Sequence, residues 1–137
     1  MNSKSKIITC FIVFFILLAG FAKGFSDTLQ FHYSKSIFSS GNYSQNYFNP
    51  DISWHNKYQA NSDSVMAFWG STTFLVWTTD AWHLLQMIEF MSWMIALLLA
   101  LRLGYGSRPF IIGAAISLYL IFHLGFWLAY DWLLLIR

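Results

Sequence analysis

Hydrophobic positions in this chain come in long blocks, not at the short periods of a soluble domain. Residues 81–103 and 110–136 are nearly continuous apolar runs, and a shorter run covers 7–22. A helix rises 1.5 Å per residue, so a run of about 22 residues extends ~33 Å and can cross a bilayer. We therefore predict an all-α membrane protein whose C-terminal part, 81–137, is an antiparallel two-helix transmembrane hairpin.

The first apolar run has the pattern of an export signal. Lys4 and Lys6 precede it, and Gly20-Phe21-Ala22 places small residues where a signal peptidase acts. Residues 1–22 are therefore a signal peptide or a signal anchor. Cleavage after Ala22 is the favoured interpretation. The alternative is an uncleaved anchor, since this run falls just below the ~17–25 residues needed to span.

Basic residues predict the orientation. Arg102 and Arg108 flank a turn that holds Gly104, Gly106 and Pro109. Basic residues next to membrane spans stay in the cytoplasm. The loop 104–109 is thus predicted to be cytoplasmic, like the N-terminus, and residues 23–80 extracytoplasmic, in an inner (plasma) membrane.

The segment 23–80 is polar but unusually rich in aromatic residues. A solvated linker is normally poor in aromatics, whereas Trp and Tyr favour the membrane interface. We expect these rings to lie on the interface or to pack against a partner. The stretch 65–77 is apolar but too short to span, which predicts an interfacial or re-entrant segment.

Composition excludes several classes of protein. The chain is 57% hydrophobic, 20% aromatic and only 10% charged, so water cannot be its only solvent. A net charge of +2, carried by scattered basic residues, gives no footprint for nucleic acid. Cys10 alone allows neither an internal disulfide nor a cysteine zinc site. The bilayer is the first predicted partner, followed by other membrane proteins or the chain itself.

Polar residues within the two predicted spans are the candidates for function, because lipid penalises them. In the first span they form a slanting stripe: Asp80, His83, Gln86 and Glu89. In the second they share one face: Tyr119, His123, Trp127, Tyr130 and Asp131. A hairpin centred near Gly106 would set Glu89 level with His123, and His83 level with Tyr130 and Asp131.

Three interpretations of these residues stay open. They could bond to one another and lock the hairpin, which we favour. They could face another subunit, with Gly113, Ala114 and Ser117 allowing close helix approach. Or they could form a proton, metal or haem site. Haem ligation by His83 and His123 is unattractive, because the expected register separates them by ~9–10 Å in depth. No metal site or cofactor is predicted.

Two short strings resemble a family of small bacterial membrane proteins of unassigned activity. The strings are Trp54-His55-Asn56-Lys57-Tyr58 and Thr79-Asp80-Ala81-Trp82-His83. That family carries an Asn-Lys-aromatic string followed by Thr-Asp-x-Trp-His at a helix start. The resemblance covers residues 54–90 and implies a bacterial inner-membrane protein. It also implies a cluster of Asn56, Lys57, Asp80, Trp82 and His83 at the outer surface, where Lys57 could neutralise Asp80.

The function predicted from the sequence is a non-catalytic accessory or scaffolding subunit of a membrane or envelope complex. Two short predicted spans leave little room for a transport pathway within one copy. The alternative is a small membrane enzyme, or a site handling metal ions or protons, that uses the intramembrane His and carboxylate residues.

Overall fold

The computed structural model describes residues 3–103 and 108–136. Its frame is three long helices: α1 (Ser3–His32), α5 (Ala81–Leu103) and α6 (Arg108–Trp127), which continues into the π-helical turn η4 (Leu128–Leu133). By length and composition, three helices are able to cross a membrane. The predicted all-helical class is confirmed, and α5 has the predicted bounds. Gly104 to Ser107, the greater part of the predicted cytoplasmic loop, lie outside the described residues.

Helix α1 is longer than the apolar run that predicted it. The predicted run ended at Ala22, whereas the helix continues to His32 without a break. Its last turns bury a narrow face that includes Ser26, Thr28 and Leu29. The two hydroxyls donate to backbone carbonyls of α1 itself, Ser26 to Lys23 and Thr28 to Gly24. Both hydroxyls have hydrogen-bond partners within the helix, so these residues can be buried in it. The helix therefore extends beyond the continuous apolar sequence.

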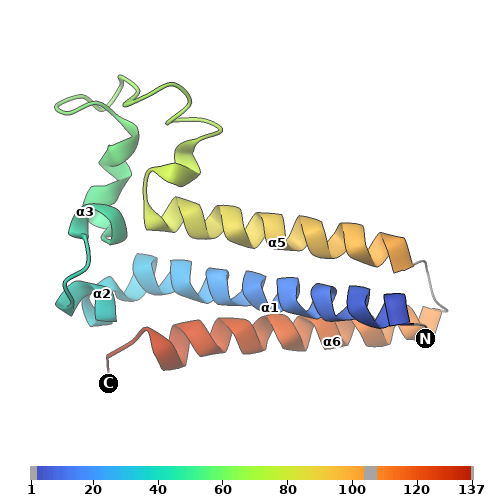
Figure 1. The fold of residues 1–137 in the computed structure, drawn as a ribbon. Helices are drawn as coiled ribbons and strands as arrows, with labels where there is room; N and C mark the ends of the chain where they lie inside the picture. Colours follow the sequence, from blue (N-terminus) through green and yellow to red (C-terminus); the bar gives the residue numbers. More distant parts are fainter. Residues whose placement is uncertain (1–2, 104–107, 137) are drawn as a thin grey trace.

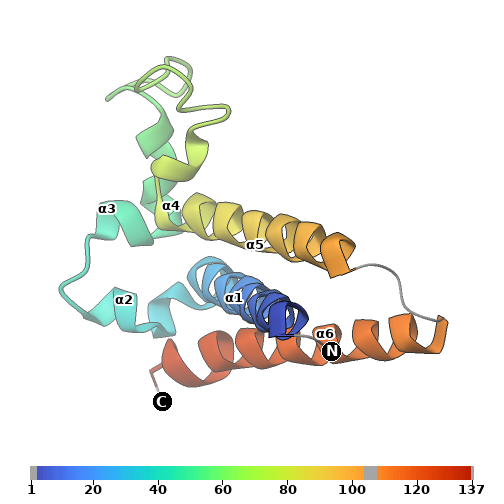
Figure 2. The same ribbon diagram turned by 45° about the vertical axis from the view of Figure 1, so that its right-hand side comes forward.

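Helix α1 lies between α5 and α6, as both ribbon views show (Figures 1 and 2). The predicted two-helix hairpin is therefore part of a three-helix arrangement, in which α1 packs along both other helices. Helices α5 and α6 meet through side chains such as Trp93 and Phe122, whose ring centres are 5.5 Å apart. The N-terminal end of α1 lies beside the C-terminal end of α5 (Figure 1).

Three glycines allow α1 and α6 to approach closely. A Cβ atom at Gly20 would clash with the carbonyl oxygen of Phe122, and one at Gly24 with that of Phe126. On the facing helix, a Cβ atom at Gly125 would clash with the carbonyl oxygen of Leu17. Small residues four apart on one helix let two backbones touch, and here Gly20 and Gly24 form that pair.

The predicted helix-packing residues lie elsewhere. Gly113 has no atom within 4 Å of the position its Cβ would take, and Ser117 is exposed. The Ser117 hydroxyl donates to the Gly113 carbonyl 2.9 Å away. Ala114, one residue further round the helix, is half-buried. Gly113 and Ser117 thus stand on the outer face of α6, and neither packs against α1.

Residues 33–80, the connecting segment, fold as short helical turns that gather at one end of the bundle (Figure 1). These are η1 (Tyr33–Lys35), α2 (Ile37–Ser40), α3 (Gln45–Phe48), α4 (Pro50–Ser53), η2 (Trp54–Lys57) and η3 (Val76–Thr78). Several of its aromatic rings form a core. Phe38 stacks between Phe25 of α1, at 5.0 Å, and Phe48, at 4.7 Å. Rings that the sequence assigned to the interface or a partner therefore pack partly on one another.

The chain end is tied to the connecting segment by backbone hydrogen bonds. The Ile37 amide donates to the Leu134 carbonyl at 2.9 Å, and the Ile136 amide donates to the Lys35 carbonyl at 2.7 Å. This short antiparallel bridge fixes the end of η4 beside the end of α1. The end of α6 is thereby held to the end of α1.

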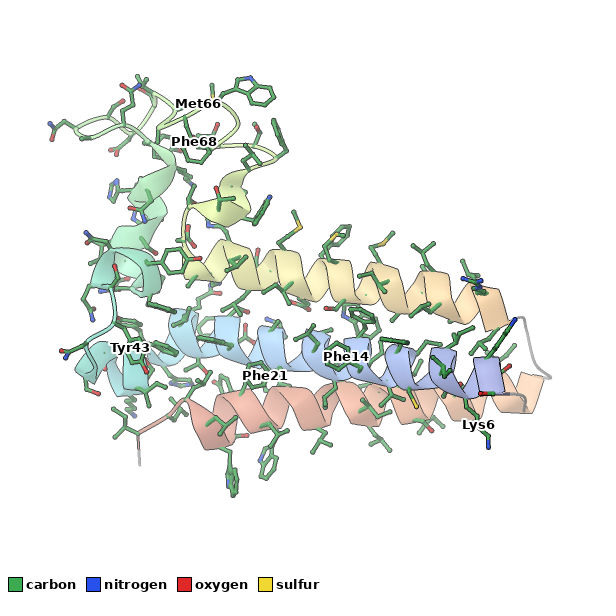
Figure 3. All side chains as sticks on the ribbon, viewed as in Figure 1. Lys6, Phe14, Phe21, Tyr43, Met66 and Phe68 are labelled. Carbon is green, nitrogen blue, oxygen red and sulfur yellow. The ribbon has the colours of Figure 1, made fainter. Side chains whose placement is uncertain are left out.

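The stretch 65–77 leaves large apolar side chains on the surface. Trp69 is 76% exposed, and Phe74 packs edge-on against it at 4.8 Å. The same stretch projects beside α5 (Figure 3) and also exposes Val65, Met66 and Phe68. An antiparallel bridge between Tyr58 and Met66 joins its start to the preceding turn. An interfacial position for 65–77 stays a prediction.

Candidate functional site

Asp80 lies immediately before helix α5 and caps its N-terminal end. Its Oδ1 accepts a hydrogen bond from the backbone N–H of His83 at 2.9 Å. The first N–H groups of a helix lack partners within it, and an aspartate just before the helix can supply one. The structure thus assigns the N-terminal cap of α5 to Asp80.

The same carboxylate holds the His83 ring. Asp80 Oδ2 is 2.6 Å from His83 Nδ1 and 3.0 Å from the Thr79 hydroxyl, which donates to it. Asp80 is only 1% exposed. Burial alone would raise the pKa of the Asp80 carboxyl, but the bonds from His83 and Thr79 and the charge of His83 outweigh it. The pKa of Asp80 is lowered, so the ionised form is held.

His83 lines an open pocket of about 380 Å³ at this end of the bundle. The pocket is walled by residues from α1, α4, η2 and the start of α5: Gln30, Pro50, Ser53, Trp54, Lys57, Asp80, Trp82 and His83. With Nδ1 directed at an ionised carboxylate, Nε2 is the His83 nitrogen left for a ligand or a proton.

Hydrogen bonds from distant parts of the chain hold the pocket walls. Asn56 donates from its side-chain amide to the Thr79 carbonyl at 2.9 Å, which ties η2 to the start of α5. The Ser71 hydroxyl donates to the Lys57 carbonyl at 2.7 Å. Trp82 Nε1 donates to Gln30 Oε1 at 3.2 Å, which joins α5 to α1. Four of the five residues that the resemblance grouped together line this pocket, and Asn56 ties two of its walls together.

Lys57 does not neutralise Asp80 as the sequence suggested. Its ammonium group lies 5.9 Å from the centre of the Trp54 ring and 5.4 Å from that of Tyr58. Asp80 is instead satisfied by His83 and Thr79. In the described part of the chain, Lys57 forms no ion pair.

The pairs expected across the hairpin are replaced by others, because α1 lies between α5 and α6 over most of their length (Figure 1). His123 Nδ1 is bonded to the Tyr119 carbonyl of its own helix at 3.0 Å. Tyr130 Oη lies 2.5 Å from His32 Nε2 of α1. Glu89 faces the ion pair that Lys23 and Asp27 form on α1, and these are the charges that act on it.

The other predicted site residues are dispersed. Gln86 is exposed on α5 one turn beyond His83, and Trp127 is exposed on α6. Asp131 lies exposed in η4, next to Tyr130. Among residues 3–103 and 108–136, no group of three His, Cys, Asp or Glu side chains could hold a metal ion.

Sequence reasoning missed the polar residues of α1. Lys23, Asp27, Gln30 and His32 were assigned to an extracytoplasmic segment, and the structure places all four on the last turns of the helix. Lys23 and Asp27 are four residues apart, the spacing of an ion pair along a helix. That spacing was the available signal for a longer helix.

These elements define a small all-helical chain that has three helices able to cross a membrane and a polar pocket at one end. Comparison with protein-family models, with curated proteins and with solved structures found no match.

Proposed function

We propose that this chain is a small integral protein of a bacterial inner membrane with three spans and a retained N-terminal helix. Retention is supported by the packing of α1, which continues past Ala22 through Gly24 and Leu29 into contact with α5 and α6. The N-terminus and the α5–α6 loop then face the cytoplasm, in line with their basic residues, and the connecting segment faces outward.

Retention of α1 predicts an uncut chain. Intact mass measurement of the protein from its own membranes should give the mass of a chain that includes residues 1–22. Cleavage after Ala22 would remove Gly20 and leave only Gly24 of the two α1 glycines that α6 approaches closely. A mature protein that begins at Lys23 would contradict a retained helix and restore the signal-peptide interpretation.

Within that membrane, the proposed role is a non-catalytic accessory subunit that docks a helix of another membrane protein on α6. One observation carries this proposal: the outer face of α6 exposes polar side chains among its apolar ones, where lipid alone would favour apolar side chains. Tyr119 is 60% exposed, and His123 lies exposed one turn further on. Gly113 and Ser117 also stand open on the outer surface of α6.

The free-energy cost of exposing polar groups to lipid favours a partner at this face. Exposed polar groups in hydrocarbon are costly, and helices in membranes associate through small residues and interhelical hydrogen bonds. The open Gly113–Ser117 surface allows close approach, and His123 Nε2 and the Tyr119 hydroxyl provide donors and acceptors. Other polar residues bond within the chain, as Asp80 does with His83 and Tyr130 with His32.

Docking at this face predicts a stable complex that one substitution disrupts. Native mass spectrometry of the gently solubilised protein should show a second, different membrane protein at fixed stoichiometry. Ser117→Leu fills the open surface and should lower recovery of that partner about tenfold, with the abundance of the chain unchanged. Leu98→Phe, which adds bulk to an exposed site on α5, is the matched control and should leave recovery intact.

The alternative is a small membrane enzyme or a metal- or proton-handling site, and the Asp80–His83 pair at an open pocket is the observation that favours it. The same spectra separate the two roles. A lone chain or a homo-oligomer that carries metal or prosthetic mass would contradict the accessory role. Partner protein without such mass would contradict the cofactor site.

A further inference from the structure

We propose that the pocket lined by Lys57, His83 and Gln30 binds an anionic phosphate group at the end of the bundle where the connecting segment lies. This site is separate from the α6 face and goes beyond an accessory role. It assigns a ligand to a pocket of about 380 Å³, which offers room for a lipid headgroup or a free phosphate ion.

The first argument is the charge of Lys57. The ion pairs within residues 3–103 and 108–136 are Lys23–Asp27, His55–Asp63 and Asp80–His83, so none of them includes Lys57. The Trp54 and Tyr58 rings attract its ammonium group without neutralising it. The pocket therefore contains a positioned cation with its charge available.

The second argument is that the one carboxylate at the pocket is already used. Both oxygens of Asp80 accept hydrogen bonds, and only 1% of the residue is exposed. The Oδ2 atom of Asp80 also holds His83 Nδ1, so Nε2 is the ring nitrogen left to meet a ligand. Asp80 is thus satisfied by His83 and Thr79 and does not occupy Lys57.

The third argument is a further donor, Gln30, on the part of the pocket wall that α1 forms. Trp82 Nε1 donates to Gln30 Oε1, which orients the amide of Gln30. In the described residues, the amide nitrogen of Gln30 takes part in no other hydrogen bond, so its N–H groups are available. An ammonium and an amide at one pocket match the acceptor oxygens of a phosphate group.

The position of the pocket favours a lipid as the source of the phosphate. It is built from the last turns of α1 and the first turn of α5, at one end of helices able to cross the membrane. Helix ends of this kind lie at the headgroup level, where Trp side chains such as Trp54 and Trp82 also favour the interface. A free phosphate ion from the outside would use the same donors.

The test uses the full chain in nanodiscs and compares two lysine substitutions. Lys57→Gln removes the positive charge proposed to bind phosphate. Lys35→Gln removes the same charge from an exposed lysine at the same end of the molecule. Native mass spectrometry measures retained phosphatidylglycerol. ³¹P NMR measures the binding of inorganic phosphate to the chain in nanodiscs of phosphatidylcholine. Lys57→Gln should lower binding at least about tenfold, and Lys57→Arg should retain most of it.

The outcomes separate the two sources of phosphate. Lys57-dependent retention of phosphatidylglycerol supports a lipid headgroup, and Lys57-dependent binding of inorganic phosphate alone supports a free ion. Equal binding by Lys57→Gln and Lys35→Gln in both experiments would overturn the site. Thermal unfolding of each variant shows whether the fold survives. Because the isolated chain is used, the result does not depend on a partner at α6.

Discussion

Gly20→Val should prevent α1 from seating against α6. The valine Cβ would clash with the Phe122 carbonyl oxygen, and no side-chain rotation relieves a clash with backbone. Overpacking typically costs 1–3 kcal/mol, and we expect about 3 kcal/mol or more here because two helix axes must separate. Gly24→Val, opposite the Phe126 carbonyl, should act in the same direction.

The measurement is the yield of folded chain in membranes, together with its thermal unfolding in detergent micelles. Gly113→Val is the matched control, because the same change is made in α6 where no atom lies within 4 Å. Its effect on folding should stay within about 0.5 kcal/mol, as for other exposed sites. Equal losses in Gly20→Val and Gly113→Val would show that the glycine contact between α1 and α6 is not what holds the helices together.

Asp80→Ala should be the second most damaging change. It removes the cap of α5 and leaves the His83 ring without its acceptor, whereas the Thr79 hydroxyl keeps the Val76 carbonyl as an acceptor. A lost cap costs about 1 kcal/mol, and one stranded buried donor costs about 1–3 kcal/mol. We expect a loss of about 2–4 kcal/mol in the free energy of unfolding. A loss below about 0.5 kcal/mol would contradict a structural role for Asp80.

Asp80→Asn isolates the contribution of the charge, since asparagine can also cap a helix. The pKa of Asp80 is lowered in the folded chain, so its ionised form stabilises the fold above the ordinary aspartate range. That contribution is complete above about pH 4 and is lost as the pH falls through the lowered pKa. The stability difference between the native chain and Asp80→Asn should therefore shrink below pH 4. A difference that stays constant from pH 7 to pH 3 would exclude a role for the charge.

The sequence was sufficient to predict helix α5, since its apolar run covers the same residues as the helix. It also predicted α6, although the helix and η4 cover Arg108–Leu133 where 110–136 was expected. Both helices could be predicted because a long apolar run bounded by arginines and glycines is compatible with few structures other than a helix. Lys57, Asp80 and His83 were also named together, from the strings that contain them.

The position of α1 could not be predicted in the same way. Its contact face is formed by Gly20 and Gly24, which add little to hydrophobicity and act only through the approach of a second backbone. Without that face, α5 and α6 were assumed to be direct neighbours, and Glu89 was matched with His123. The pair formed by His32 and Tyr130 joins positions 98 residues apart, and nothing local in the sequence specifies it.

The central place of α1 also sets the order in which this molecule is completed. Of the three long helices, α1 is made first and packs along both others, and Gly125 is made about a hundred residues after Gly24. During that interval α6 is not there to cover Gly20 and Gly24. The backbone bonds at Leu134 and Ile136 can form only once α6 has been made, so they close an arrangement that α1 began.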